Sequence, residues 1–534
     1  MWTRRAESVF RSAVERLRSS PRRVWWTTFV LVTVLSGLWG LANPPFAAPD
    51  EPAHVKRAVA LDHGELTGKS LSPRLLRNLR GDTSNLVVRV PAVYATAQPA
   101  CFAFKPNTSA ACLLVGGSSR DVDTLTTAGR HPPAYYAVVG VASLVSSPGS
   151  GTLYLMRLIG AAMTGAFVAT AMTALQRTTA PRLIATGLLV AITPMVLFVS
   201  SAVTPSVPEI AAALALWVSG LVLVSQTNER VDKRLVTAVG ISASVLALSR
   251  QLSPLWLGLI ALSMLLFATR GSVRNLARSS WARLWGVIVA ACALAQIGWV
   301  LVVKPLDATL LGRKRIDVPY SEIVRATFGA TFGQYREMIG LFGWLDTTSP
   351  ALTYLLWTVA IAFLFLLAVM VARRRHILLL LMLVITTVVA PVALQIPAYR
   401  DVGAVFWQGR YTLPLAVGIP ILAAMSIAST ERGRRLAEPR VSWAIGGIVV
   451  IGSTLAFAQN LRRYTVGYNG DVWYWLRPQW SPPISPLLLT AGYVIAFVAF
   501  VAWVLAFSRA PDRAPKEAHA EVRVPVGSEP QLTS

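Results

Sequence analysis

Two adjacent acids, Asp50 and Glu51, are the first residues whose types could do chemistry, and they follow the first long apolar run of the chain. They stand within residues 44–54, where four prolines stiffen the backbone. A carboxylate held at such a boundary could act as a general base or as a metal ligand. Acids also stabilise the first turn of a helix, so a capping role stays open.

Two other segments carry groups of this kind. Glu209 follows Pro205 and Pro208 and begins an otherwise apolar run, where an acid is rare and functional by default, or else complements the helix dipole. His131 stands before a proline pair and Tyr135. The histidine could hold a phosphate, act as a base, or serve structure alone.

A set of cations lies at the ends of other apolar runs. Arg250 ends one run, Gln408, Arg410 and Tyr411 open another, and Arg400 stands shortly before them. The guanidinium fork of arginine can bind two oxygens of a phosphate, which makes a lipid phosphate or pyrophosphate the natural ligand. The alternative is that these side chains reach lipid headgroups at helix ends.

Cysteine and aromatic residues add two structural expectations. Cys101 and Cys112 lie in one long polar segment, and we expect them to form a disulfide in an oxidising compartment. Cys292 lies within an apolar run and is expected to pack there. The aromatic run 473–475 is typical of a membrane-boundary belt, although such rings could also stack on sugars.

The composition tells what kind of protein must position these residues. Of the 534 residues, 54% are hydrophobic and only 14% are charged, and the net charge is +25. Soluble domains are about a quarter charged, so the composition excludes a soluble enzyme and an ordinary nucleic-acid binder. It predicts an all-α polytopic membrane protein, whose positive charge reports topology rather than a nucleic-acid partner.

Apolar runs of about 20 residues, long enough to cross a bilayer, recur along the chain. The predicted spans are 24–42, 152–175, 183–203, 209–226, 235–250, 252–269, 283–304, 351–372, 377–396, 411–429, 441–459 and 485–508. With both termini cytoplasmic, these twelve spans put five Lys- and Arg-rich connections inside. The stretch 132–145 is too short to span and would invert the topology, so it is interpreted as a juxtamembrane outer helix.

The predicted organisation has three parts. Residues 1–23 form a basic cytoplasmic or interfacial segment, residues 24–508 form the membrane domain, and residues 509–534 form a disordered cytoplasmic tail. The two large outer segments are 43–131 and 305–350. No Walker loop, GxGxxG, Cys/His metal motif or Ser-His-Asp signature stands out.

Several short motifs, in this order, carry a resemblance. They are PDEPAH at 49–54, the Cys101 and Cys112 pair, HPPAYY at 131–136, 205–209, 250–254, 343–346 and 408–411. With them the sequence resembles a bacterial family of multi-spanning membrane proteins of unknown function, which in turn is similar to the GT-C glycosyltransferases.

The resemblance implies a GT-C-like enzyme with about 12 transmembrane helices in the bacterial inner (plasma) membrane. It would move a sugar, with inversion, from a polyprenyl-phosphate carrier to a cell-envelope glycan or glycolipid acceptor on the outer face. Asp50 would be the base, with Glu51 beside it and Glu209 as a second acid, although Pro-x-x-x-Glu stands where the GT-C pattern is Asp-Pro. Mg²⁺ or Mn²⁺ could bind near Asp50. The substrate-binding candidates are His54, His131, Tyr135, Arg250, Arg400, Gln408, Arg410 and Tyr411.

Other functions remain open at this stage. A flippase or transporter for a lipid-linked saccharide would use the same basic cavity, although it would more naturally carry paired charges at the bilayer midplane. A polymerase would join whole repeat units, and a structural partner would dock through residues 43–131. Substitution of Asp50 and Glu51 distinguishes an enzyme from a scaffold, because only an enzyme would lose its activity while its folding stays intact.

Overall fold

The computed structural model describes most of the chain. The described residues are 17, 20–79, 84–96, 99–114, 116–226, 230–304, 317–402, 404–436 and 438–507. The predicted tail 509–534, almost all of the predicted interfacial helix within 1–20, and part of the predicted outer segment 305–350 lie outside this range.

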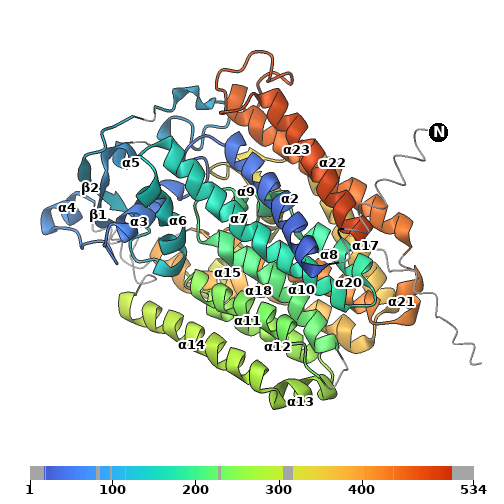
Figure 1. Ribbon diagram of the computed structural model, residues 1–534. Helices are drawn as coiled ribbons and strands as arrows, with labels where there is room; N and C mark the ends of the chain where they lie inside the picture. Colours follow the sequence, from blue (N-terminus) through green and yellow to red (C-terminus); the bar gives the residue numbers. More distant parts are fainter. Residues whose placement is uncertain are drawn as a thin grey trace, which may run out of the picture.

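The described chain folds into a bundle of apolar helices (Figure 1). Among the described residues, eight helices are long and apolar enough to cross a membrane. They are α2 (Pro21–Ala42), α7 (Ser150–Ala174, with η3, Leu175–Arg177), α10 (Ser206–Ser225), α14 (Ser280–Val303), α17 (Ala351–Val371), α18 (Arg374–Val402), α22 (Pro439–Val466) and α23 (Pro486–Phe507). Each coincides with one predicted span.

The predicted number of twelve spans is not confirmed, because four predicted spans are broken or short. The pairs α8 (Pro181–Ala191) with α9 (Pro194–Ser200) and α12 (Ser253–Phe267) with α13 (Arg270–Arg278) are bent by 69° and 120°. Counting each pair as one span gives up to ten. The other two predicted spans form α11 (Lys233–Ser249) and the broken pair α19 (Leu413–Ala416) and α20 (Gly418–Ala428).

The break between α8 and α9 follows from local chemistry. Pro194 has no N–H to continue the ladder of α8, and the Thr193 hydroxyl accepts a hydrogen bond from Val196 N at 3.3 Å. That bond caps a new helix at α9. A run that reads as one apolar span in sequence therefore becomes two helices of different direction.

The helices differ strongly in how much of their surface the protein covers. Helix α10 is entirely buried and packs against α7 and α11, so it forms the centre of the bundle. Helix α14 is only 6% buried and lies along the edge of the bundle, where it packs mainly on α11 (Figure 1). An apolar helix with so little protein cover is expected to face lipid.

A smaller layer covers one end of the bundle. It contains α3 (Glu51–Asp62), α4 (Pro73–Asn78), α5 (Ala92–Thr96), η1 (Pro99–Cys101), η2 (Ala110–Cys112), α6 (Pro133–Val145) and the antiparallel strands β1 (Leu86–Pro91) and β2 (Asp121–Thr126). We call this the loop end. The predicted juxtamembrane helix 132–145 is present as α6, which packs on α3. The all-α expectation omitted β1–β2 and the short pair β3 (Leu341–Phe342) and β4 (Thr347–Thr348).

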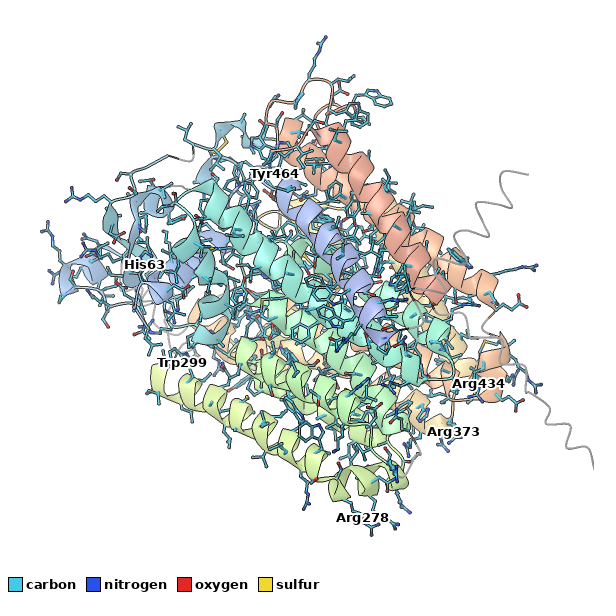
Figure 2. All side chains as sticks on the ribbon, in the orientation of Figure 1. His63, Arg278, Trp299, Arg373, Arg434 and Tyr464 are labelled. Carbon is cyan, nitrogen blue, oxygen red and sulfur yellow. A yellow bond between two sulfur atoms is a disulfide. The ribbon has the colours of Figure 1, made fainter. Side chains whose placement is uncertain are left out.

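Positive charge gathers at the opposite end. Figure 2 shows Arg278, Arg373 and Arg434 at the lower right of the bundle, away from His63 and Tyr464. Each of these three arginines comes from a different connection that the sequence assigns to the cytoplasm. They lie toward the same end, as that topology requires.

Candidate functional site

The backbone at the start of α3 holds Asp50 in an unusual conformation. Its φ is +64°, in the left-handed region, and Phe46 nearby also has a positive φ of 63°. Non-glycine residues in this region cost about 1–3 kcal/mol and cluster at functional sites. Asp50 is the residue before the first helical position, yet its side chain makes no capping hydrogen bond. The capping interpretation from the sequence therefore does not describe this carboxylate.

The Asp50 carboxylate instead faces an arginine from the other end of the sequence. Arg410 Nη2 donates to Asp50 Oδ2 at 2.7 Å, and the two residues are 360 positions apart. The Asp50 side chain is 47% exposed, whereas that of Arg410 is only 6% exposed. A buried cation thus presents a reachable carboxylate, which is the geometry a general base needs.

Arg410 is positioned by the short helix η5 (Gly409–Tyr411) and by α16 (Thr331–Gly340). Gly409 N donates to Glu337 Oε2 at 2.5 Å, which fixes η5 against α16. Burial is the main cause that raises the pKa of the Glu337 carboxyl. The Nε of Arg410 is buried and has no acceptor among the described residues. It is therefore an unpaired donor enclosed by the protein.

A second arginine completes the basic side of the cluster. The Arg250 guanidinium lies 4.4 Å from the centre of the Tyr411 ring, and that of Arg410 lies 5.3 Å from it. Arg250 Nη1 also donates to Ser206 Oγ at 3.1 Å. The fold therefore brings Asp50, Arg250, Arg410 and Tyr411 together from three distant parts of the chain.

Glu209 lies behind Arg250 rather than beside Asp50. Its side chain is 1% exposed, its Oε2 is 3.7 Å from Arg250 Nη1, and its Oε1 accepts from Ser253 Oγ at 2.7 Å. Ser253 Oγ in turn accepts from Arg250 N at 3.0 Å. Glu209 thus holds Arg250 in place through both the guanidinium and the backbone.

Two histidines meet at one tyrosine next to this cluster. Tyr136 Oη is 2.8 Å from His54 Nδ1 and 3.0 Å from His131 Nδ1. Burial, followed by the charges of Arg410 and Arg250, lowers the pKa of His54 well below its usual value. The pKa of His131 is lowered in the same way, with burial the largest cause.

The remaining substrate-binding candidates divide between the site and its surroundings. Tyr135 is buried, and its hydroxyl accepts from Thr204 N at 2.9 Å, which links α6 to the start of α10. Gln408 immediately precedes η5, and its Oε1 is buried with no partner among the described residues. Arg400 lies on the Tyr320 ring at 4.1 Å, at α15 (Tyr320–Gly329), and no described contact joins it to the Asp50 cluster.

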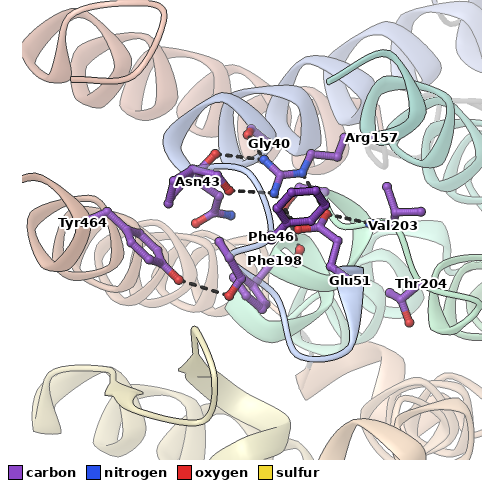
Figure 3. Close-up of polar contacts among 12 residues, drawn as sticks. Gly40, Asn43, Phe46, Glu51, Arg157, Phe198, Val203, Thr204 and Tyr464 are labelled. Carbon is purple, nitrogen blue, oxygen red and sulfur yellow. Dashed lines mark hydrogen bonds and ion pairs between the residues drawn. The ribbon is translucent and has the colours of Figure 1, made fainter. Parts of the chain in front are cut away.

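Glu51 points into the protein, where it forms a buried ion pair (Figure 3). Arg157 donates to both carboxylate oxygens at 2.9 and 2.7 Å, and Val203 N donates to Glu51 Oε1 at 3.0 Å. The remaining N–H groups of Arg157 reach the carbonyls of Gly40, Asn43 and Pro44. The pair ties α2, α3, α7 and the chain before α10 together.

The sequence interpretation missed Arg157, which lies in the second turn of an apolar span. A charge inside such a run was itself the available signal, because intramembrane charges are costly and need a partner. What the sequence could not give was the identity of that partner, 106 residues away.

Cys101 and Cys112 form a disulfide, and another buried arginine anchors the loop that the disulfide closes. Arg463, at the end of α22, donates to the carbonyls of Phe102 and Thr108 at 2.8 and 2.7 Å. It also pairs with Asp346 at 2.9 Å. The loop is therefore held to the bundle, but by groups that do not touch the Asp50 cluster.

The donor set around Asp50 does not fit a protein-held metal ion. Among the described residues, no three His, Cys, Asp or Glu side chains are grouped as metal ligands. Asp50 offers one carboxylate, and its nearest partner is the cation of Arg410. We therefore derive no step through Mg²⁺ or Mn²⁺.

An apolar cavity lies along helix α16, which also holds η5. It measures about 770 Å³ and is lined by side chains of α8, α15, α16, α17, α18 and α20, among them Phe328, Phe332, Met338 and Val388. Its lining and Glu337, the residue that fixes η5, share the helix α16.

The helices and the buried site define a multi-pass membrane protein. The chain belongs to the family described as predicted membrane protein DUF2142, whose model matches residues 33–419. No curated protein matches it.

Two solved structures are similar. The crystal structure of ArnT from Cupriavidus metallidurans bound to undecaprenyl phosphate has 14% identity and a TM-score of 0.44, over 90% of this chain and 77% of that chain. The apo form of the same protein has 13% identity and a TM-score of 0.43, over 91% and 77% of the two chains. Neither similarity is strong enough to carry an activity over to this chain.

Proposed function

We propose that this protein is a GT-C-type glycosyltransferase, which moves a sugar from a polyprenyl-phosphate carrier to a cell-envelope glycan or glycolipid. The observation that carries the proposal is the Asp50–Arg410 pair. It sets a half-exposed carboxylate 2.7 Å from a buried guanidinium, beside a second arginine, Arg250. A base and a phosphate site next to each other are what transfer from a sugar phosphate requires.

In the proposed reaction, Asp50 takes the proton of an acceptor hydroxyl, and the acceptor oxygen attacks the anomeric carbon. The bond from that carbon to the phosphate oxygen breaks, and polyprenyl phosphate leaves with the electron pair. Attack opposite the leaving group inverts the anomeric configuration. Arg250 and Arg410 stabilise the charge on the leaving phosphate.

The apolar cavity supports a polyprenyl carrier rather than a nucleotide. Its lining is almost wholly hydrocarbon, and its wall α16 also holds the helix that carries Arg410. A prenyl chain in the cavity would gain about 25 cal/mol for each Å² of apolar surface removed from water. We assign the cavity to the first isoprene units of the carrier.

The proposal also sets the orientation in the membrane. The Lys- and Arg-rich connections favour the cytoplasmic side of the inner membrane for one end of the bundle. The loop end, with its disulfide, then faces the outer, oxidising side. Both termini would be cytoplasmic, and the sugar would be transferred on the outer face.

The test is a transfer assay with purified protein in lipid nanodiscs and a panel of radiolabelled polyprenyl-phosphate sugars, with envelope glycan as acceptor. The wild type is expected to transfer label from at least one donor, and Asp50→Asn is expected to transfer almost none. Full activity of Asp50→Asn would overturn the assignment of the base. Binding of a lipid-linked saccharide without any transfer would instead favour a flippase or a polymerase.

A further inference from the structure

His54, Tyr136 and His131 form a hydrogen-bonded group next to the Asp50 cluster. All three side chains come from the loop end: His54 from α3, Tyr136 from α6 and His131 from the chain just before α6. Tyr136 is fully buried, and its hydroxyl contacts the Nδ1 atoms of both rings, with no other partner among the described residues. We call these three residues the His–Tyr–His unit.

The number of hydrogens in the unit requires the two imidazole rings to be different tautomers. The tyrosine hydroxyl has one hydrogen, so it can donate to only one of the two Nδ1 atoms. The other Nδ1 must then carry its own hydrogen and donate to the tyrosine oxygen. Two accepting rings would leave one Nδ1 unpaired, and two donating rings would leave the buried hydroxyl hydrogen without an acceptor, each at a cost.

The surrounding charges keep both rings neutral. His54 faces the cations of Arg410 and Arg250, and the Arg57 guanidinium lies 5.6 Å from the centre of the Tyr136 ring. Asp50 is the acid that acts in the opposite direction on His131. Burial and these cations lower the pKa of both histidines, so neither ring carries a charge at neutral pH.

A neutral imidazole has one N–H and one lone pair. The ring that donates through Nδ1 therefore has a bare, accepting Nε2, and the ring that accepts at Nδ1 has a donating Nε2–H. Neither Nε2 bonds to a described residue, and neither is a fully enclosed unpaired atom. Each therefore keeps some access to water or to a ligand.

We propose that the His–Tyr–His unit presents one fixed donor and one fixed acceptor that together recognise hydroxyl groups of an uncharged sugar. The inference rests on the proposed function, which supplies a sugar phosphate to the same site. His54 lies one helical turn after Asp50, so the unit lies close to the proposed base. A sugar hydroxyl both donates and accepts, which matches this pair, whereas a carboxylated sugar would meet a bare nitrogen lone pair.

The first test reads the tautomers directly, without any substrate. The full chain, labelled with ¹⁵N-histidine in nanodiscs, has only five histidines, so the His54 and His131 signals can be assigned with single variants. At pH 7 one of these rings is expected as the Nδ1–H form and the other as the Nε2–H form. Tyr136→Phe should abolish the split, whereas Tyr135→Phe, which loses a hydroxyl bonded to Thr204 instead, should keep it.

The second test separates sugar from phosphate. Tritiated undecaprenyl phosphate and its glucose, galactose and mannose esters are titrated into the wild type and Tyr136→Phe, with thermal unfolding as the control for folding. The variant should bind the bare lipid phosphate as the wild type does, within twofold. It should bind the preferred hexose ester about tenfold more weakly, as expected when the substrate loses well-oriented hydrogen bonds.

Each other outcome contradicts either the role of the His–Tyr–His unit or the proposed function. If both rings have the same tautomer, or if either is charged at pH 7, the unit does not present one donor Nε2 and one acceptor Nε2. Equal weakening for both ligands, or no weakening, would make the unit structural only. The wild type could also bind undecaprenyl phosphate but none of its hexose esters. That result would contradict recognition of a sugar by the unit and would leave the phosphate site intact. Binding of neither ligand would overturn the proposed function itself.

Discussion

Asp50 and Glu51 are neighbours in sequence and have the same charge, yet they lie in opposite kinds of environment. The Glu51 side chain is 0% exposed and accepts three hydrogen bonds, two of them from Arg157. The Asp50 side chain is 47% exposed and meets one arginine, Arg410. One acid therefore belongs to the scaffold and the other to the proposed site.

The backbone explains how adjacent residues diverge so sharply. Asp50 has a left-handed φ, and Glu51 begins α3. The Glu51 carboxylate is buried in the bundle, whereas that of Asp50 is half exposed. The comparison teaches that acidity and position in a motif do not separate a structural acid from a candidate base, whereas burial and fixed partners do.

The largest effect is expected from Glu51→Gln. The substitution leaves the buried charge of Arg157 without its carboxylate, which typically costs about 3–5 kcal/mol. Thermal unfolding of the purified protein should show a much lower midpoint, or the protein should fail to accumulate. Asp50→Asn is the matched control one residue away and should lower the midpoint much less, because the Asp50 side chain is half exposed. Equal stability of Glu51→Gln and wild type would contradict the structural assignment.

Asp50→Asn is expected to act on the reaction instead. Loss of a general base typically lowers a rate by about 10²–10⁴-fold. Asp50 is half exposed and asparagine keeps an acceptor oxygen for Arg410, so the free energy of unfolding should fall by less than in Glu51→Gln. Initial rates of transfer at saturating donor measure the first quantity, and thermal unfolding measures the second. A large loss of stability with normal turnover would show that Asp50 is structural and is not the base.

Arg410→Lys should weaken the donor site by a smaller amount. Lysine keeps the charge but loses the planar fork that can hold two phosphate oxygens, and kcat/KM for the donor should fall about tenfold. Arg336→Lys is the control, because the Arg336 guanidinium also lies over a tyrosine ring, 4.8 Å from the centre of that of Tyr354, and no described contact joins it to Asp50. If both variants lost activity equally, the loss could not be attributed to phosphate binding.

Glu209→Gln is expected to have the smallest effect. Glutamine still accepts from Ser253 but holds Arg250 less firmly, so donor KM should rise about fivefold, as for the loss of one charge-assisted bond, while kcat changes little. This split marks a residue that acts through Arg250. A hundredfold loss of kcat at unchanged KM would instead make Glu209 a second catalytic acid.

Much of the fold could be predicted from the sequence, because the lipid imposes simple rules. Spans need about 20 apolar residues, and eight of the predicted spans match helices of the described chain closely. The segment 132–145 was predicted to be a helix too short to cross, and it forms the 13-residue helix α6. The broken spans could not, because the bend at Pro194 depends on the Thr193 cap and on the helices packed around it.

The candidate site was only partly predictable. Asp50, Arg250 and Arg410 were chosen because each is a charge at the end of an apolar run, and the fold does bring them together. Arg400 was chosen on the same ground, but it packs on Tyr320 instead. Tyr136 belongs to the HPPAYY motif but was not chosen as a site residue, because a tyrosine in an apolar helix is typical of a core until its two histidine partners are seen.

The sequence by itself determined that this chain is a multi-pass membrane protein and which of its few charges need an explanation. Hydrophobicity and charge bias act residue by residue, so they can be read along the chain. Only the tertiary structure decided that Arg157 neutralises Glu51 while Arg410 faces Asp50, across separations of 106 and 360 residues. Pairing at that range depends on how helices pack, which no local pattern encodes.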